Sequence, residues 1–168
     1  HYTRLPYAVL MTSLGCPLRC TYCASGKLWK GFLKRDPLTI ADSIERLTGR
    51  DETEDMVFFD DAILFGDFKT LLKELSRRKI VRRFHLPNGV HARLLDVEMA
   101  GLLYDNNFKT IKLGLETSDP SMQLSTGGKV TNEDFFRAVK NLADAGFTAR
   151  EMSAYIMLNL PGQKVEDV

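Results

Sequence analysis

The three cysteines of the chain, Cys16, Cys20 and Cys23, lie in one short segment at C-x3-C-x2-C spacing, directly after the apolar run Tyr7–Met11. Three thiols cannot all be paired as disulfides, and a segment this short can bring three sulfurs to one metal centre. A structural zinc site normally has a fourth ligand, and no histidine lies nearby in the sequence. Iron–sulfur cubes are held by cysteine thiolates, usually four, so three leave one iron open to a non-protein ligand. An open position is what a catalytic metal needs.

Two other interpretations of the cysteines stay open at this level. Cys20 and Cys23 alone form a C-x-x-C pair, which is also typical of a redox pair or of half a zinc site. The rival functions are therefore a non-catalytic zinc or iron–sulfur redox module on an α/β scaffold, and a cluster-bearing electron carrier.

Composition is compatible with an enzyme core. The 168 residues are 44% apolar, enough for one globular domain with a sizeable core, and contain 23 basic and 22 acidic residues. This balance does not favour nucleic acid as a partner. We expect no membrane span, because no apolar run is long enough, and a cytoplasmic location, because clustered free thiols suit a reducing compartment.

Strand and helix patterns alternate along the chain. Apolar runs predict strands covered on both faces, and amphipathic stretches between them predict helices. The predicted strands are Ala8–Ser13, Met56–Phe59, Arg83–Leu86, Thr110–Leu115 and Ala154–Leu160. The predicted helices are Leu38–Thr48, Phe68–Lys79, Leu94–Asn107 and Asn132–Ala145, the last ending at Gly146. This alternation predicts a parallel α/β sheet, either an open doubly wound sheet or a barrel.

Polar residues follow several predicted strands, where active groups gather in such folds. Asp60-Asp61 follows the second strand, and either aspartate could cap the next helical turn. Asn88-Gly89 follows the third strand and is an ordinary turn pair. Glu116 follows the fourth strand. Lys129, in Gly127-Gly128-Lys129, could equally be an exposed loop lysine.

The segment Ser13-Leu14-Gly15-Cys16-Pro17-Leu18-Arg19-Cys20-Thr21-Tyr22-Cys23 resembles the cluster loop of radical S-adenosylmethionine (radical SAM) enzymes. Leu113-Gly114-Leu115-Glu116-Thr117-Ser118 is similar to a stretch of the branch with methylthiotransferases, Elongator-type and cobalamin-dependent members. Leu160-Pro161-Gly162-Gln163 is similar to another family motif. The resemblance implies a partial parallel (β/α)6 TIM-like barrel, about five βα units of which are present here.

The resemblance also implies cofactors and residue roles. Cys16, Cys20 and Cys23 would bind a [4Fe–4S] cluster, whose open iron is chelated by S-adenosylmethionine. The implied cofactor contacts are Tyr22, Asp60, Asp61, Asn88, Glu116, Lys129 and Leu158. Asp60 and Asp61 would accept hydrogen bonds from the cofactor amino group, Glu116 would bind the ribose hydroxyls, Lys129 would pair with the carboxylate, and the segment around Leu158 would flank the adenine.

The implied activity is reductive cleavage of S-adenosylmethionine to a 5′-deoxyadenosyl radical, which abstracts hydrogen from an unknown substrate. It needs an external one-electron reductant of the flavodoxin or ferredoxin type, and no side chain as acid or base. Lys27, Lys30, Lys34 and Arg35 beside two aromatic residues form a basic patch that could hold phosphate or bases. We expect residues 1–168 to be a radical SAM core domain cut at both ends of a longer chain, with a helix starting near Val165–Val168.

Overall fold

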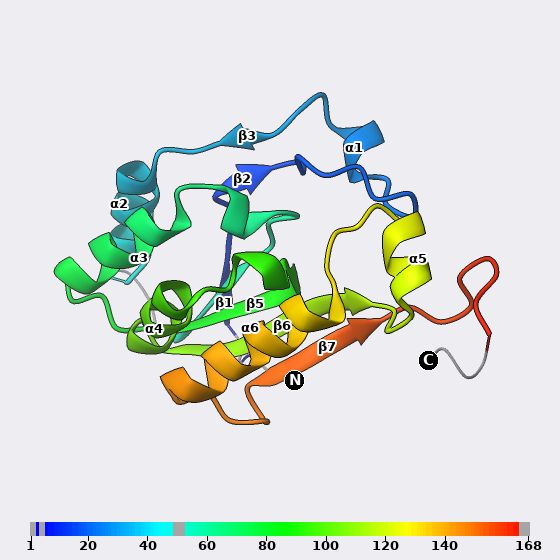
Figure 1. Ribbon diagram of the computed structural model, residues 1–168. Helices are drawn as coiled ribbons and strands as arrows, with labels where there is room; N and C mark the ends of the chain where they lie inside the picture. Colours follow the sequence, from blue (N-terminus) through cyan, green and yellow to red (C-terminus); the bar gives the residue numbers. More distant parts are fainter. Residues whose placement is uncertain (1–2, 4–5, 49–52, 165–168) are drawn as a thin grey trace.

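The computed structural model describes residue 3 and residues 6–48 and 53–164 of the chain; the helix start expected at 165–168 lies outside them. Within these residues, a parallel sheet runs in the order β1-β4-β5-β6-β7 (Figure 1). Its strands are β1 (Tyr7–Leu10), β4 (Asp55–Phe58), β5 (Arg83–Val90), β6 (Phe108–Glu116) and β7 (Met152–Ile156). A small antiparallel pair, β2 (Ser13–Leu14) and β3 (Leu33–Lys34), lies apart from it.

Four longer helices connect and cover the strands: α2 (Pro37–Thr48), α3 (Phe68–Arg77), α4 (Val97–Asp105) and α6 (Asn132–Ala145). Shorter elements are the helices α1 (Ser25–Leu28) and α5 (Pro120–Ser125) and the 3₁₀ turns η1 (Ile63–Phe65) and η2 (Ala92–Leu94). None of the helices in the described part of the chain has the length and apolar character needed to cross a membrane.

The strand order decides between the two architectures left open by the sequence. Sheet neighbours follow chain order from β1 to β7, with no reversal of the kind that splits a doubly wound sheet at a switch point. The fold is therefore α/β, with the sequential parallel strands of a partial TIM-like barrel. The carboxyl ends of all five strands meet at one edge of the sheet, where the site lies.

The core lies between the sheet and the longer helices. The rings of Phe58, Phe84 and Phe108, on three adjacent strands, all contact one another, with centroids 5.8, 5.2 and 6.1 Å apart. Phe68 of α3 meets Phe58 edge-on at 5.4 Å. Aromatic pairs of this kind contribute about 0.5–1.5 kcal/mol each beyond area burial, so they fix the strand spacing beneath the site.

The opposite face of the same strands carries a buried polar cluster at the amino ends. Asp55 accepts hydrogen bonds from Arg83 Nε at 2.6 Å and Nη2 at 2.8 Å, and lies 3.2 Å from His85 Nε2. His85 Nδ1 lies 2.9 Å from Thr110 Oγ1. Burial lowers the pKa of His85. Because charged groups are buried here only with partners, the cluster joins three strands.

Several predicted boundaries are wrong for local reasons. The first strand ends at Leu10 instead of Ser13, because hydrogen bonds to Asp60 turn the chain away from the sheet. The third continues to Val90, so Asn88 lies in β5 rather than in a turn. The fifth is Met152–Ile156, and its side chains are mostly exposed rather than covered on both faces. The helix expected at Leu94–Asn107 divides into η2 and α4.

Candidate cofactor site

The cysteine loop is anchored to the sheet by one buried carboxylate. Asp60, two residues after β4, accepts hydrogen bonds from the backbone N–H and hydroxyl groups of Thr12 and Ser13, all within 3.1 Å. Asp60 is 3% exposed. Charge-assisted bonds to a buried carboxylate are among the stronger ones in proteins, so Asp60 fixes where the cysteine loop leaves the sheet. This use of Asp60 is neither the helix cap nor the cofactor contact considered from the sequence.

The turn into the loop requires a glycine. Gly15 has a φ of +81°, and a Cβ there would lie 2.4 Å from the carbonyl oxygen of Gly31 and 3.0 Å from Trp29 Cβ. The residues after α1 therefore pack directly on the start of the loop. On the other side, Thr21 N donates to Thr126 O at 3.1 Å, and a Cβ on Gly127 would lie 3.3 Å from Cys20 Cα. The loop is held between two glycine contacts.

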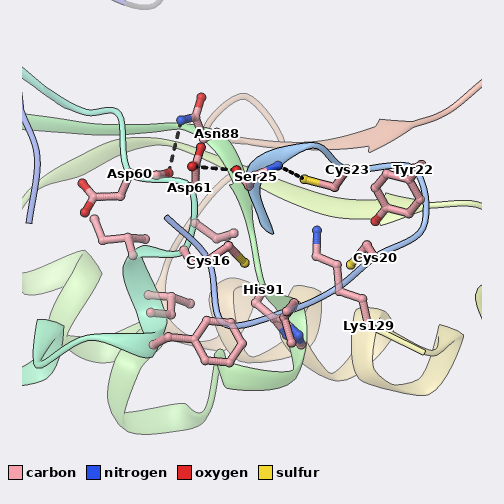
Figure 2. Close-up of a pocket in the computed structure, with 17 residues that line it drawn as sticks. Cys16, Cys20, Tyr22, Cys23, Ser25, Asp60, Asp61, Asn88, His91 and Lys129 are labelled. Carbon is pink, nitrogen blue, oxygen red and sulfur yellow. Dashed lines mark hydrogen bonds between the residues drawn. The ribbon is translucent and has the colours of Figure 1, made fainter. Parts of the chain in front are cut away.

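The three thiols are free and line one pocket together with residues from the ends of β4 and β5 (Figure 2). Burial raises the pKa of Cys16, and negative charge on Cys20 or Cys23 would raise it further, whereas Lys129 lowers it. Negative charge on a neighbouring sulfur thus opposes ionisation of Cys16 unless a positive centre binds, and three thiols in one pocket are a donor set that fits a cationic metal cluster. No three Cys, His, Asp or Glu residues in the described ranges are arranged to hold a single metal ion.

The sequence-predicted residues Asp61 and Asn88 also line this pocket. Asp61 is exposed, and its Oδ2 accepts from Ser25 Oγ at 2.7 Å, which links the end of β4 to the start of α1. Ser25 N in turn lies 3.5 Å from Cys23 Sγ. Asn88 Nδ2 donates to the backbone oxygen of Asp60 at 3.2 Å. Asp61 keeps oxygen atoms accessible to a ligand, while the carboxylate of Asp60 is taken up by the anchor.

Glu116 and Lys129 form an ion pair beside the pocket. Lys129 Nζ lies 3.1 Å from Glu116 Oε1, and both side chains are about 15% exposed. Glu116 has a φ of +69°, rare for a residue with a side chain, at the last position of β6. A Cβ on Gly114 would lie 2.6 Å from Lys129 Nζ and 2.9 Å from Glu116 Oε1. Gly114 thus makes the space in which the pair sits.

The loop that carries Lys129 is fixed from behind. Arg93 donates to Gly128 O at 3.0 Å and to Asp134 Oδ2 at 3.1 Å. Asp119 caps α5 by accepting from Ser121 N and Met122 N, and Pro120 occupies the first turn. Asp119 and Pro120 therefore stabilise the helix that supports this loop.

The pocket contains buried polar groups that make no hydrogen bond in the described residues. They are the Tyr22 hydroxyl and His91 Nδ1. Burial, followed by the negative charge of Glu116 and Cys20, raises the pKa of Tyr22. Burial, followed by the charges of Lys129 and Arg93, lowers the pKa of His91 to about 4. Because unpaired buried polar groups are costly, these atoms are suited to meet a ligand.

His91 was not among the residues predicted to bind the cofactor. It is 7% exposed, lines the pocket, and meets Phe65 edge-on with ring centroids 5.1 Å apart. The sequence signal is weak, because one histidine in a strand-to-helix connection is usually solvated. Ser25 was also missed, since no pattern connects it with Asp61. Two of the predicted contacts do not line the pocket: Glu116 lies beside it, paired with Lys129, and Leu158 is 70% exposed in the loop after β7.

That loop is ordered by its own glutamine. Gln163 Nε2 donates to Met157 O at 3.1 Å, and Leu160 N donates to Gln163 Oε1 at 3.0 Å. Met157 N donates to the backbone oxygen of Glu116 at 2.7 Å, so the loop starts at the end of β6. Gln163 thus closes the Leu-Pro-Gly turn next to the site.

Two curated proteins match nearly all of the chain at low sequence identity. An anaerobic magnesium-protoporphyrin IX monomethyl ester cyclase from Rubrivivax gelatinosus is 23% identical over 155 residues, 91% of this chain and 28% of that protein. An uncharacterized methyltransferase from Pyrococcus horikoshii is 23% identical over 168 residues, 98% of this chain and 35% of that protein. The chain spans about a third of the length of these relatives.

Solved structures share the fold at low identity. The radical S-adenosylmethionine methyltransferase TsrM from Kitasatospora setae, with cobalamin and a [4Fe–4S] cluster bound, matches with a TM-score of 0.76 and 20% identity over 89% of this chain and 30% of that one. The cobalamin-dependent enzyme OxsB matches with a TM-score of 0.69 and 15% identity, over 88% and 23%. The family model of the radical SAM superfamily matches residues 10–168. The chain, whose cysteine loop, parallel sheet and strand-end residues surround one pocket, belongs to the radical SAM superfamily.

Proposed function

We propose that residues 1–168 are the radical SAM core domain of a longer enzyme. In this proposal Cys16, Cys20 and Cys23 ligate a [4Fe–4S] cluster, and S-adenosylmethionine fills the pocket beside it. The observation that carries it is the convergence of three free thiols with Asp61, Asn88 and His91 on one pocket at the carboxyl ends of the strands. The whole enzyme, with its external one-electron reductant, would work in the reducing cytoplasm.

The thiolates would be the cluster's protein ligands. Each one is easier to form when a positive charge is close, and Lys129 lowers the pKa of Cys16 in this way. Asp60 and Gly15 position the ligands: the first fixes the chain before Cys16, the second allows the sharp entry turn. Substitution at either position is expected to move the sulfurs without removing one.

The polar residues of the pocket would hold S-adenosylmethionine. Asp61 accepts hydrogen bonds from its amino group, while the Asp60 side chain contributes from behind, through the anchor. The Glu116 carboxylate meets the ribose hydroxyls, and Lys129, its partner at 3.1 Å, pairs with the cofactor carboxylate. The remaining pocket contacts are Tyr22 through its buried hydroxyl and Asn88 at the strand end, and the loop around Leu158, outside the pocket, would flank the adenine.

When bound, the cluster and S-adenosylmethionine would together supply the one-electron chemistry of the reaction, with methionine as the leaving group of the cleaved cofactor. The pocket residues would bind and orient S-adenosylmethionine and would exclude water from it. Ile63, Leu64 and Phe65 line the pocket beside the polar groups and provide its apolar wall. No side chain in the pocket is required as an acid or base.

The test is anaerobic reconstitution of the full-length protein followed by reduction with dithionite in the presence of S-adenosylmethionine. Iron and sulfide content, broad absorption near 400 nm and formation of 5′-deoxyadenosine are the expected results. Zinc bound to the thiols with no such absorption would instead support the non-catalytic metal module. A cluster that forms without any 5′-deoxyadenosine would support the electron carrier.

A further inference from the structure

The segment that carries the cysteines has an unusual charge. Residues 13–35 contain five basic residues and no acidic residue, whereas the rest of the chain has 18 basic and 22 acidic residues. A chain that is nearly neutral overall thus has a net charge of +5 on one segment and −4 elsewhere. The five residues are Arg19, Lys27, Lys30, Lys34 and Arg35. A local field of one sign attracts partners of the other sign even when net charge is close to zero.

Most of these cations are not used within the fold. Lys34 pairs with Asp67, and Arg35 donates to Met11 O. Arg19, Lys27 and Lys30 are exposed and form no ion pair with any residue in the described ranges. Ten of the cations elsewhere in the described ranges do form ion pairs. They are Lys69, Lys73, Arg77, Arg78, Arg83, Arg93, Lys109, Lys129, Arg137 and Lys140.

Exposed apolar side chains lie among these free cations. Leu28 is 71% exposed, Leu33 64% and Trp29 41%. Leu28 is in α1, Trp29 directly follows it and Leu33 is in β3, and both elements lie outside the layer of longer helices (Figure 1). We define the α1 surface as Arg19, Lys27, Leu28, Trp29, Lys30 and Leu33. An aromatic and aliphatic centre with a charged rim is typical of a protein–protein interface, while nucleic-acid interfaces are more polar.

The α1 surface is next to the proposed cluster ligands but outside the pocket. Cys23 is exposed, and Ser25, the first residue of α1, donates its N–H to Cys23 Sγ at 3.5 Å. Of the residues of this surface, none lines the pocket that receives S-adenosylmethionine. A protein bound to the α1 surface would therefore lie beside Cys23 without occupying the pocket.

We propose that the α1 surface is the docking site of the reductant, an acidic one-electron carrier protein of the flavodoxin type. This rests on the proposed function. One electron leaves the fully reduced flavin, which becomes the one-electron-oxidised flavin, and reduces the cluster from the 2+ to the 1+ state. Positive charge without internal partners selects an acidic carrier and speeds its encounter, and the apolar residues stabilise the bound complex.

The experiment compares two reductants on the reconstituted full-length enzyme. Lys27→Glu/Lys30→Glu is expected to slow formation of 5′-deoxyadenosine driven by enzymatically reduced flavodoxin about 10-fold or more, because charge reversal replaces attraction by repulsion. The rate with dithionite stays unchanged. The matched control, Lys140→Glu/Arg150→Glu, has the same change in net charge on exposed residues away from the α1 surface and leaves both rates unchanged.

A binding measurement gives a readout that does not depend on catalysis. Flavodoxin binding to the immobilised enzyme should weaken as ionic strength rises, and this dependence should be smaller in Lys27→Glu/Lys30→Glu. Leu28→Ser should weaken binding without altering the salt dependence. Because these residues are exposed, the variants are expected to fold.

Three results would overturn the proposal. Equal loss with dithionite and flavodoxin would show that the residues shape the site itself. Unchanged flavodoxin affinity and rate would exclude the surface as its docking site, and weakened binding of a single-stranded oligonucleotide with unchanged flavodoxin binding would assign the surface to nucleic acid. If wild-type enzyme makes no 5′-deoxyadenosine with dithionite, the proposed function fails, while the binding measurement still decides the docking site.

Discussion

The two ends of the parallel sheet use charged residues in opposite ways. At the amino ends, Asp55 is bound by both nitrogens of the Arg83 fork and lies next to His85, which reaches Thr110. At the carboxyl ends, Lys129 and Glu116 make a single contact, and polar atoms of the same pocket lack partners among the described residues. A cluster whose charged groups pair with one another serves stability, whereas buried polar atoms that face a pocket can bind a ligand. Substitutions at the two ends should therefore affect different measurements.

The largest effect is expected at the cysteines. Replacing Cys16, Cys20 or Cys23 by Ala should abolish 5′-deoxyadenosine, because a cube held by two protein thiolates loses its site. The melting temperature of the protein without cluster should change little, since the cysteine side chains are partly exposed or exposed. Iron content, absorption near 400 nm and product are the measurements.

The matched control at the same loop is Ser25→Ala, which keeps all three thiols and should keep the cluster. A cysteine variant that retains full iron content and product would remove that thiol from the ligand set.

The second effect should be confined to stability. Asp55→Ala leaves the partly buried Arg83 and the buried His85 without their carboxylate, and should lower the free energy of unfolding by about 3–5 kcal/mol. Urea denaturation of the protein without cluster measures it. In the folded variant, the affinity for S-adenosylmethionine should equal that of the wild type.

Glu54→Ala serves as control, because Glu54 is exposed and 3.9 Å from Arg83 Nη2. If Asp55→Ala weakened cofactor binding as strongly as stability, the two ends of the sheet would not be independent.

The third effect should be confined to binding. Glu116→Gln removes a charged acceptor proposed for the ribose, and should weaken S-adenosylmethionine binding about 10- to 30-fold, the loss of one charge-assisted hydrogen bond. Calorimetric titration of the reconstituted enzyme measures the affinity, and the unfolding free energy should change by only about 1 kcal/mol because the glutamine oxygen can still accept a hydrogen bond from Lys129.

Lys129→Gln separates the two partners, since it should weaken binding of the carboxylate end and leave adenosine binding intact. Wild-type affinity in Glu116→Gln would remove this residue from the cofactor site.

The smallest effect concerns pH. The pKa of His91 is about 4 in the folded protein, below its usual value of about 6.5, so the unfolded state binds more protons between these values. The contribution of neutral His91 to the free energy of unfolding is complete above pH 6.5 and is lost as the pH falls toward 4. At pH 5.5 the loss is about 1 kcal/mol. His85 contributes in the same direction.

Urea denaturation at neutral pH and at pH 5.5 should therefore give a smaller difference for His91→Leu than for the wild type. The same pH dependence in both proteins would contradict the buried, neutral state of His91.

Much of the fold could be predicted because long amphipathic helices carry strong periodic signals. Asn132–Ala145 is predicted to the residue, since Thr131 caps its start in a capping box and Gly146, at φ +112°, ends it. The short pair of β2 and β3 could not be predicted. It depends on contacts of Asp60 with Thr12 and Ser13, 48 and 47 residues away along the chain.

Residues of the candidate site could be predicted where a sequence motif marks them. They could not be predicted where their position depends on packing. The cysteine triplet and Glu116 stand out by spacing and by their position after apolar runs. The different roles of Asp60 and Asp61 depend on which carboxylate points inward, and neighbouring identical residues give no sequence signal for that. His91 joins the pocket because β5 continues to Val90, beyond the Asn88-Gly89 pair that predicted a turn.

The anchor made by Asp60 has a consequence for protein engineering. The cysteine loop is not a self-contained segment, because it receives its position from a carboxylate at the end of a neighbouring strand. Grafting residues 13–35 onto another barrel should give a properly placed cluster only when the recipient supplies an aspartate at the matching strand end. The unit that can be transplanted is the loop together with its distant acceptor.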